Sequence, residues 1–125
     1  MRVLLAVAVA SALGGVCRYS LGGVIARRSP GVFPWETLLV NVTGAFLLGL
    51  LFVVSTERYA VAPWLRAAVL VGFVGSYTTF STWTLESWRL LEDGAYGLGL
   101  ANLFGSLAAG LVATYAGIVV GRAVA

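Results

Sequence analysis

The sequence predicts an all-α integral membrane protein that forms one domain over residues 1–125. Two observations of composition and one of pattern support this prediction. Hydrophobic residues make up 60% of the chain and charged residues only 10%, whereas a soluble domain has about 25% charged residues. The apolar residues also gather into stretches that are long enough to cross a bilayer, which takes about 20 residues of helix. A soluble fold of this composition would expose large apolar surfaces to water.

Four such stretches predict four transmembrane helices, over residues 3–26, 33–55, 64–91 and 95–121. Short polar connectors separate them. Pro34 and Pro63 lie where two of the helices would begin, and proline favours the first turn of a helix. The first stretch starts like a secretory signal peptide, but its apolar run continues to Ala26, so we expect it to be retained as a helix.

The distribution of arginines leaves the orientation of the chain open. If the helices alternate in direction, one membrane face carries Arg2, Arg58, Arg66 and Arg122, and the other carries Arg27, Arg28 and Arg89. An excess of Lys and Arg on the cytoplasmic side normally sets orientation, and here the excess is one charge. Either other features of the chain or a single decisive charge fix the orientation, or the chain inserts both ways and opposite copies pair as an antiparallel, dual-topology dimer.

Small residues in the fourth stretch favour an oligomer. They recur at spacings that let helix backbones approach closely, at Ala101, Gly105 and Ala109 and then at Gly117 and Gly121. Four helices alone would also make a thin bundle. We therefore expect an oligomer surrounded by membrane lipid.

Composition excludes several other classes of function. The chain has no histidine, and Cys17 is its one cysteine, so neither a disulfide within the chain nor a Cys/His metal site can form. The arginines form no basic stripe, which argues against nucleic-acid binding. No nucleophile is paired with a base, so we expect no enzyme and no organic cofactor.

Polar side chains within the predicted helices point to a pathway. Such groups are costly in a bilayer and usually face a partner or water. Here they recur four residues apart, which places them on one helix face: Thr37 and Asn41, then Thr78, Thr82 and Glu86, then Asn102 and Ser106. Arg18 adds a charge to the first helix.

The third stretch contains GFVGSYTTFSTWTLE at residues 72–86, with seven hydroxyls between Ser76 and Thr84. This number exceeds what bonding back to the helix's own carbonyls would be expected to use. Glycines followed by Ser-Tyr-Thr-Thr make a poor helix, so we expect the third helix to be broken near residues 75–80. Broken backbone at membrane depth must be buried or line water, where its carbonyls can coordinate a cation. Donor groups and the ring edges of Phe80 and Trp83 suit a small polar or anionic solute.

These segments resemble the Fluc-type (CrcB-like) fluoride channels over essentially the full length of the chain. The matching pieces are GGVCRY at 14–19, ETLLVNVTGAFLLG at 36–49, GFVGSYTTFSTWTLE at 72–86 and NLFGS at 102–106. The resemblance implies a passive channel in the plasma (cell inner) membrane that exports fluoride to relieve its toxicity. It also implies an antiparallel homodimer with two separate pathways and a structural sodium ion at its centre.

The resemblance implies roles for individual residues as well. The backbone carbonyls of Gly75 and Thr78 would bind the sodium ion, and Arg18 would lie toward a vestibule. The fluoride pathway would be formed by Asn41, Phe80, Ser81, Thr82, Trp83, Asn102 and Ser106, with Thr37 and Glu86 at one end. Trp83 and Asn102 replace a Phe and a Tyr that are usual in the family, and we expect the two changes to compensate.

Two other functions remain open on the sequence alone. A small four-helix multidrug or cation exporter would have comparable size, but such proteins rest on a carboxylate in the first helix, where this chain has Arg18. A non-transporting membrane assembly subunit would account for the small residues but not for the hydroxyls.

Overall fold

The computed structural model describes residues 1–124, which fold into helices joined by short connections without any β-strand in that range. The predicted all-helical class is therefore confirmed. In chain order the helices are α1 (Arg2–Arg28), α2 (Trp35–Val53), η1 (Val54–Arg58), α3 (Pro63–Ala67), η2 (Ala68–Val74), α4 (Gly75–Tyr77), α5 (Phe80–Glu92), α6 (Tyr96–Leu100), η3 (Ala101–Gly105) and α7 (Ser106–Val124). The segments written η are π-helical turns that continue the neighbouring α-helices.

Within residues 1–124, three continuous helical segments are long and apolar enough to cross a membrane: Arg2–Arg28, Trp35–Arg58 and Tyr96–Val124. The third segment lies between Trp35–Arg58 and Tyr96–Val124 and was predicted at residues 64–91. It differs from these long helices. It consists of one helical part from Pro63 to Tyr77 and a second from Phe80 to Glu92. Neither part has the length of the other three segments.

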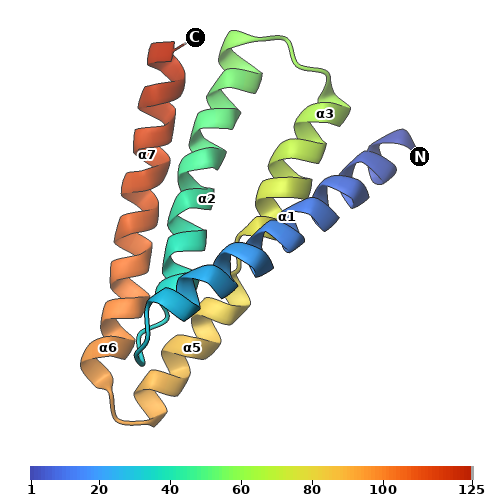
Figure 1. Ribbon diagram of the computed structural model, residues 1–125. Coiled ribbons are helices and arrows are strands. Elements are labelled where there is room, and N and C mark those ends of the chain that lie inside the picture. Colours follow the sequence, from blue (N-terminus) through green and yellow to red (C-terminus); the bar gives the residue numbers. More distant parts are fainter. Residues whose placement is uncertain (125) are drawn as a thin grey trace.

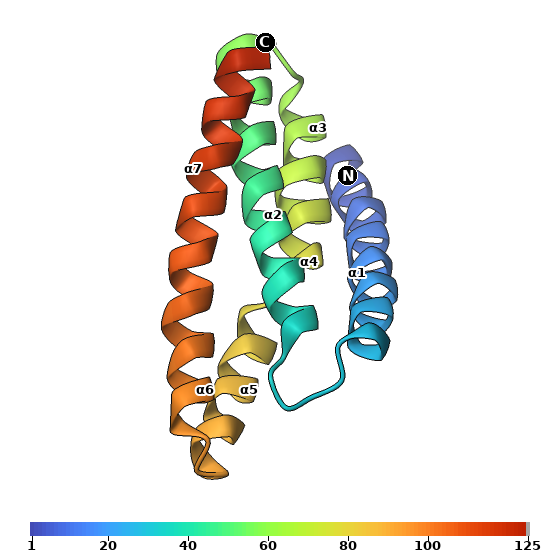
Figure 2. The same ribbon diagram turned by 60° about the vertical axis from the view of Figure 1, so that its left-hand side comes forward.

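Helices α2 and α7 lie side by side along the molecule, and α1 crosses the third segment (Figures 1 and 2). Both termini lie at one end of the molecule, together with the connection at residues 59–62. The connection at residues 29–34 and the turn at residues 93–95 lie at the other end. The four segments therefore alternate in direction.

Glycines allow the closest helix contacts. A Cβ on Gly117 of α7 would overlap with the carbonyl of Phe46 in α2, and a Cβ on Gly14 of α1 would overlap with that of Phe73. Side chains at these positions would force the backbones apart. Gly105 differs, because nothing in the described part of the chain lies within 4 Å of the place its Cβ would take.

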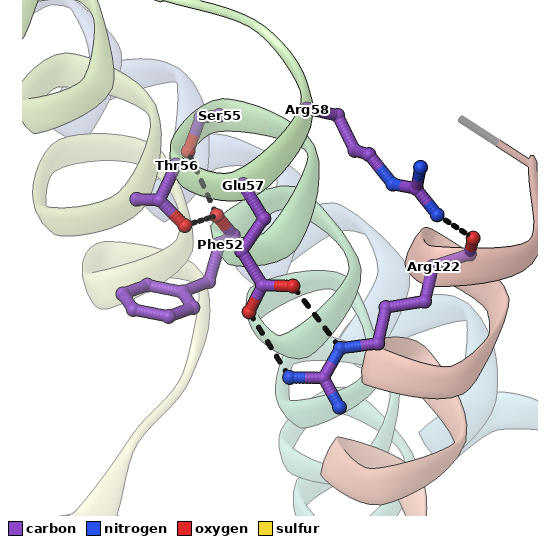
Figure 3. Close-up of polar contacts among 6 residues, drawn as sticks. All are labelled: Phe52, Ser55, Thr56, Glu57, Arg58 and Arg122. Carbon is purple, nitrogen blue, oxygen red and sulfur yellow. Dashed lines mark hydrogen bonds and ion pairs between the residues drawn. The ribbon is translucent and has the colours of Figure 1, made fainter.

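An ion pair joins the ends of the second and fourth segments (Figure 3). Arg122 donates from Nε and Nη2 to the two carboxylate oxygens of Glu57, at 3.1 and 3.0 Å. The Arg58 guanidinium also donates to the Arg122 carbonyl. Glu57 and Arg122 are both exposed, so solvent weakens their attraction.

The turn between α5 and α6 requires a glycine at residue 94. Gly94 has φ +77°, a left-handed conformation that favours glycine. Its N–H donates to the carbonyl of Leu91, and the N–H of Ala95 donates to that of Leu90, at 3.1 and 2.8 Å. These two bonds end α5 and turn the chain back toward α7.

Candidate functional site

The third segment is interrupted at two threonines. Helix α4 ends at Tyr77, and Thr78 (φ −83°, ψ 162°) and Thr79 (φ −147°, ψ 115°) are extended before α5 begins at Phe80. β-branched residues suit extended backbone. Thr79 also caps α5, because its hydroxyl oxygen accepts the N–H of Thr82 at 3.3 Å.

Side chains from the first two segments satisfy the backbone at this interruption. The Asn41 amide donates from Nδ2 to the Thr79 carbonyl at 2.9 Å, and its Oδ1 accepts the Thr79 N–H at 2.7 Å. Arg18 donates from Nη1 to the Thr78 carbonyl at 3.2 Å. Such partners are required where backbone groups lie away from water.

The interruption brings two helix ends of opposite polarity together. The Thr79 N–H, which would continue the helix by bonding to the Gly75 carbonyl, donates to Asn41 instead. The last carbonyls of α4 therefore form a partly negative end, and the first N–H groups of α5, beginning at Phe80, form a partly positive end.

Two hollows meet at Thr79. The first, which we call the groove, has a volume of about 380 Å³ and lies between α2, the third segment and α7. The second, which we call the polar cavity, has a volume of about 710 Å³ and lies between α1, α2 and α5. Because Thr79 lines both, the interruption stands between them.

The polar cavity contains both positive and negative side chains. Arg18 and Arg27 line it together with Glu36 and Glu86. Thr37 donates its hydroxyl to Glu86 Oε1 at 2.9 Å. Glu86 Oε2 is buried and has no hydrogen-bond partner among the described residues. Glu36 and Glu86 also line a smaller hollow of about 330 Å³ beside the connection at residues 29–34.

The groove is mainly apolar, and two aromatic rings form part of its wall. Phe80 and Trp83 meet edge to face, with ring centroids 5.3 Å apart and an interplanar angle of 65°. The Phe80 side chain is 73% exposed. The hydroxyls of Thr78 and Thr114 line the groove, but they donate to carbonyls of their own helices, those of Val74 and Gly110.

A hydrogen-bond network lies behind the Trp83 ring. The indole Nε1 donates to the backbone carbonyl of Asn102 at 2.8 Å. The Asn102 side chain donates to Ser87 Oγ at 2.8 Å, and Ser87 donates to the Trp83 carbonyl at 2.8 Å. Ser106 donates its hydroxyl to Asn102 Oδ1 at 3.2 Å. Asn102 is fully buried, at 0% exposure.

A family profile described as "CrcB-like protein, Camphor Resistance (CrcB)" matches residues 5–118. The chain belongs to this CrcB-like family. The predicted resemblance is therefore confirmed. The matched range includes the interruption, the residues that brace it and the network behind Trp83.

Individual relatives of this CrcB-like chain match it over nearly its whole length. It is 45% identical over 123 residues to the "Fluoride-specific ion channel FluC" of Citrifermentans bemidjiense, which covers 98% of this chain and 99% of the relative. It is 47% identical over 115 residues to "Fluoride-specific ion channel FluC 2" of Geobacillus kaustophilus, covering 92% and 89%. The protein of the same name, FluC, from Geobacter sulfurreducens is 43% identical over 122 residues, covering 98% of each. With three long apolar helices, the CrcB-like chain is a multi-pass membrane protein.

Most of the residues that the sequence singled out surround the two hollows. The groove is lined by Asn41, Gly75, Thr78, Phe80, Trp83 and Ser106. The polar cavity is lined by Arg18, Thr37, Thr82 and Glu86. Ser81 and Asn102 line neither hollow: Ser81 is exposed, and Asn102 is buried against Ser87 and Ser106.

The sequence reasoning missed Ser87, and it counted Thr79 among the hydroxyls of residues 76–84 without predicting its place at the interruption. Thr79 lines both hollows and supplies the peptide groups that Asn41 binds. Ser87 is buried and joins Asn102 to the backbone of Trp83. A signal existed for Ser87, since it lies four residues after Trp83 and so shares its helix face.

Proposed function

We propose that this CrcB-like chain is a fluoride-selective passive ion channel that exports fluoride across the cell membrane and so relieves its toxicity. The observation that carries this proposal is the match to fluoride-specific ion channels at 43–47% identity over nearly the whole chain. The same stretch of sequence forms the interruption and the two hollows described above. The transported solute is fluoride, and the chain is not an enzyme.

Donor groups near the interruption support an anion as the solute. The Asn41 amide uses one hydrogen on the Thr79 carbonyl, which leaves a second hydrogen for a solute in the groove. Thr82 accepts the Thr79 hydroxyl at 2.9 Å, so its own hydroxyl hydrogen is free for the polar cavity. The N-terminus of α5 attracts negative charge to the same place.

The aromatic rings suit the same solute. A small anion loses strongly bound water as it enters a narrow path, and donors must replace that water. The edges of aromatic rings carry partial positive charge. The exposed ring of Phe80 offers such an edge in the groove, and Trp83 fixes its tilt from one side.

The groove of a single chain is open, and we propose that a second copy in the opposite orientation closes it. The open face carries exposed apolar side chains, including Phe80 and Leu111 beside the groove. The near-equal numbers of arginines at the two ends permit both orientations. Membrane lipid would cover the remaining apolar surface. A cysteine introduced at Ala60 should then react with an impermeant thiol reagent from both sides of a membrane, in similar amounts.

A sodium ion at the centre of this dimer fits the residues of the interruption. The Gly75 carbonyl has lost its helical partner, and the Thr78 carbonyl has one oxygen lone pair left beside the bond from Arg18. Carbonyl oxygens suit such a cation. Two carbonyls do not complete the coordination of such an ion, so the second copy would supply the matching pair. The ion would provide a fixed positive charge that joins the two copies.

The alternative functions find less support in the structure. Helix α1 contains no Asp or Glu between Arg2 and Arg28, so it lacks the carboxylate on which a four-helix multidrug exporter depends. An assembly subunit would use the glycine contacts but would leave the polar cavity without a role.

Efflux from liposomes tests the proposal. Liposomes that contain the purified protein and are loaded with fluoride should release it rapidly, whereas chloride should lag far behind. Equal efflux of the two anions would exclude a fluoride-selective channel. Proton-driven uptake of a cationic drug without fluoride efflux would indicate the exporter instead. Protein-free liposomes provide the baseline, and no transport of either kind would favour the assembly subunit.

A further inference from the structure

We infer that Asn102 is a positioning residue, which holds the Trp83 ring at the wall of the groove and orients the Ser106 hydroxyl without itself contacting the transported ion. The inference rests on the proposed function for what passes through the groove. It assigns Asn102 a different role from the pathway contact that its sequence position suggested.

Burial separates Asn102 from the groove. Its side chain is 0% exposed and does not line either hollow, whereas Trp83 and Ser106 both line the groove. Both polar atoms of its side chain are used, one on Ser87 and the other on Ser106. An ion in the groove therefore meets the partners of Asn102 and not Asn102 itself.

The hydrogen bonds that hold Trp83 form a closed ring of contacts between α5 and η3. The indole donates to the Asn102 carbonyl, the Asn102 amide donates to Ser87, and Ser87 donates to the carbonyl of Trp83. The Asn102 side chain thus fixes how far η3 lies from α5, and that separation decides whether the Asn102 carbonyl reaches the indole. The π-helical turn at residues 101–105 places this carbonyl and side chain at the fourth segment's contact with α5.

The direction of these bonds also determines which atoms face the groove. The Trp83 N–H points to Asn102, so the indole offers carbon-bound ring hydrogens to the groove and not its N–H donor. The Ser106 hydroxyl donates its single hydrogen to Asn102 Oδ1. Only the lone pairs of its oxygen can therefore face the groove. Without Asn102, the hydroxyl of Ser106 would be free to turn its hydrogen toward an anion.

Ser87 allows a test at a distance from the groove. It is 1% exposed, lines no hollow and reaches Trp83 only through this network. Ser87→Ala removes the acceptor of the Asn102 amide. Thr84→Ala is the matched control, since Thr84 lies on the same helix and its hydroxyl donates to the carbonyl of Ser81 without touching Asn102.

The first measurement follows the indole N–H of Trp83 by ¹H–¹⁵N NMR of the detergent-solubilised protein, with Trp83→Phe identifying its resonance. Ser87→Ala and Asn102→Ala should move this resonance upfield and speed its exchange with water, because the hydrogen bond to Asn102 weakens. Thr84→Ala should leave it in place. An unmoved resonance in both Ser87→Ala and Asn102→Ala would overturn the inference. Ser87→Ala decides the matter if Asn102→Ala does not fold.

The second measurement is fluoride efflux from liposomes. Ser87→Ala and Asn102→Ala should each change the rate by about tenfold, the effect of one hydrogen bond of ordinary strength. In a double-mutant cycle, Asn102→Ala should change efflux less in the Trp83→Phe background than on its own, because the part of its effect that passes through the indole is already lost and only the part through Ser106 remains. Additive effects, or unchanged efflux in both single variants, would overturn the inference. If the unaltered protein releases no fluoride, the proposed function fails, and the NMR result still decides whether Asn102 holds Trp83.

Discussion

The side chain of Asn41 binds both backbone polar groups of Thr79, accepting the N–H at 2.7 Å and donating to the carbonyl at 2.9 Å. In this way α2 supplies the hydrogen bonds that the third segment loses where it leaves the helix. Asn41 therefore has two roles in the proposed channel. It stabilises the interruption, and it presents its remaining amide hydrogen to the groove.

These two roles separate when Asn41 is replaced. Asn41→Ala removes both hydrogen bonds and should destabilise the protein by about 1–3 kcal/mol, since two half-buried peptide groups lose their partners. Asn41→Asp keeps an acceptor for the Thr79 N–H, so it should unfold at a higher temperature in detergent than Asn41→Ala. It should still lose most fluoride efflux, because a carboxylate places negative charge beside the anion. Full efflux in Asn41→Asp would show that this amide is not the donor.

Arg18 should matter through its charge and through its contact with Thr78. Arg18→Gln removes the guanidinium from the polar cavity, so fluoride efflux should fall several-fold, and more at low salt than at high salt. Arg18→Lys keeps the charge but loses the fork of N–H groups, so it should lose less. Efflux is measured over a range of ionic strengths. Arg2→Gln, at the first residue of α1 and outside the groove and the polar cavity, is the control and should not change the salt dependence.

The contact of α2 with α7 should not tolerate a side chain at Gly117. Gly117→Ala would push a methyl group into the Phe46 carbonyl, and overpacking of this kind costs about 1–3 kcal/mol. The unfolding midpoint in detergent should fall accordingly. Gly97→Ala provides the control, because nothing lies within 4 Å of its added Cβ. It should be neutral or slightly stabilising, and equal losses in the two variants would contradict the packing argument.

The ion pair between Glu57 and Arg122 should contribute little despite its two-point geometry (Figure 3). Both side chains are exposed, so solvent already satisfies them when they part. Glu57→Gln should therefore leave the unfolding midpoint and fluoride efflux unchanged at physiological salt. A clear loss of stability that disappears in high salt would show that the pair holds α2 against α7.

Much of the fold could be predicted because hydrophobic length is a strong signal in this sequence. The ends of the long helices differ from the predicted spans by a few residues; the first, for example, covers Arg2–Arg28 rather than 3–26. The interrupted segment was harder. The glycines suggested the interruption, yet Gly72 and Gly75 are helical and the extended residues are Thr78 and Thr79.

The hydroxyls of residues 76–84 were also difficult to interpret from sequence. Their number indicated a pathway lining, but Thr78 and Thr84 bond back to their own segment, and Thr79 bonds to Thr82. Among the described contacts, back-bonding to carbonyls of the same segment therefore uses two of the seven hydroxyls, which agrees with the expectation that it could not use them all. The partners of Asn102 were equally hard to predict. Its spacing from Ser106 indicates that the two side chains share a helix face, but it does not indicate which neighbouring helix that face contacts. Those partners depend on tertiary contacts between α5 and η3.

The bracing of Thr78 and Thr79 also bears on the order in which the chain enters the bilayer. The groups that satisfy their backbone, Arg18 and Asn41, both precede them in the sequence. When the third segment leaves the ribosome, its partners have already been synthesised. An uncompensated interruption in lipid would cost several kcal/mol for each bare peptide group. A rearranged gene that placed the third segment first would therefore expose this defect before any partner existed to repair it.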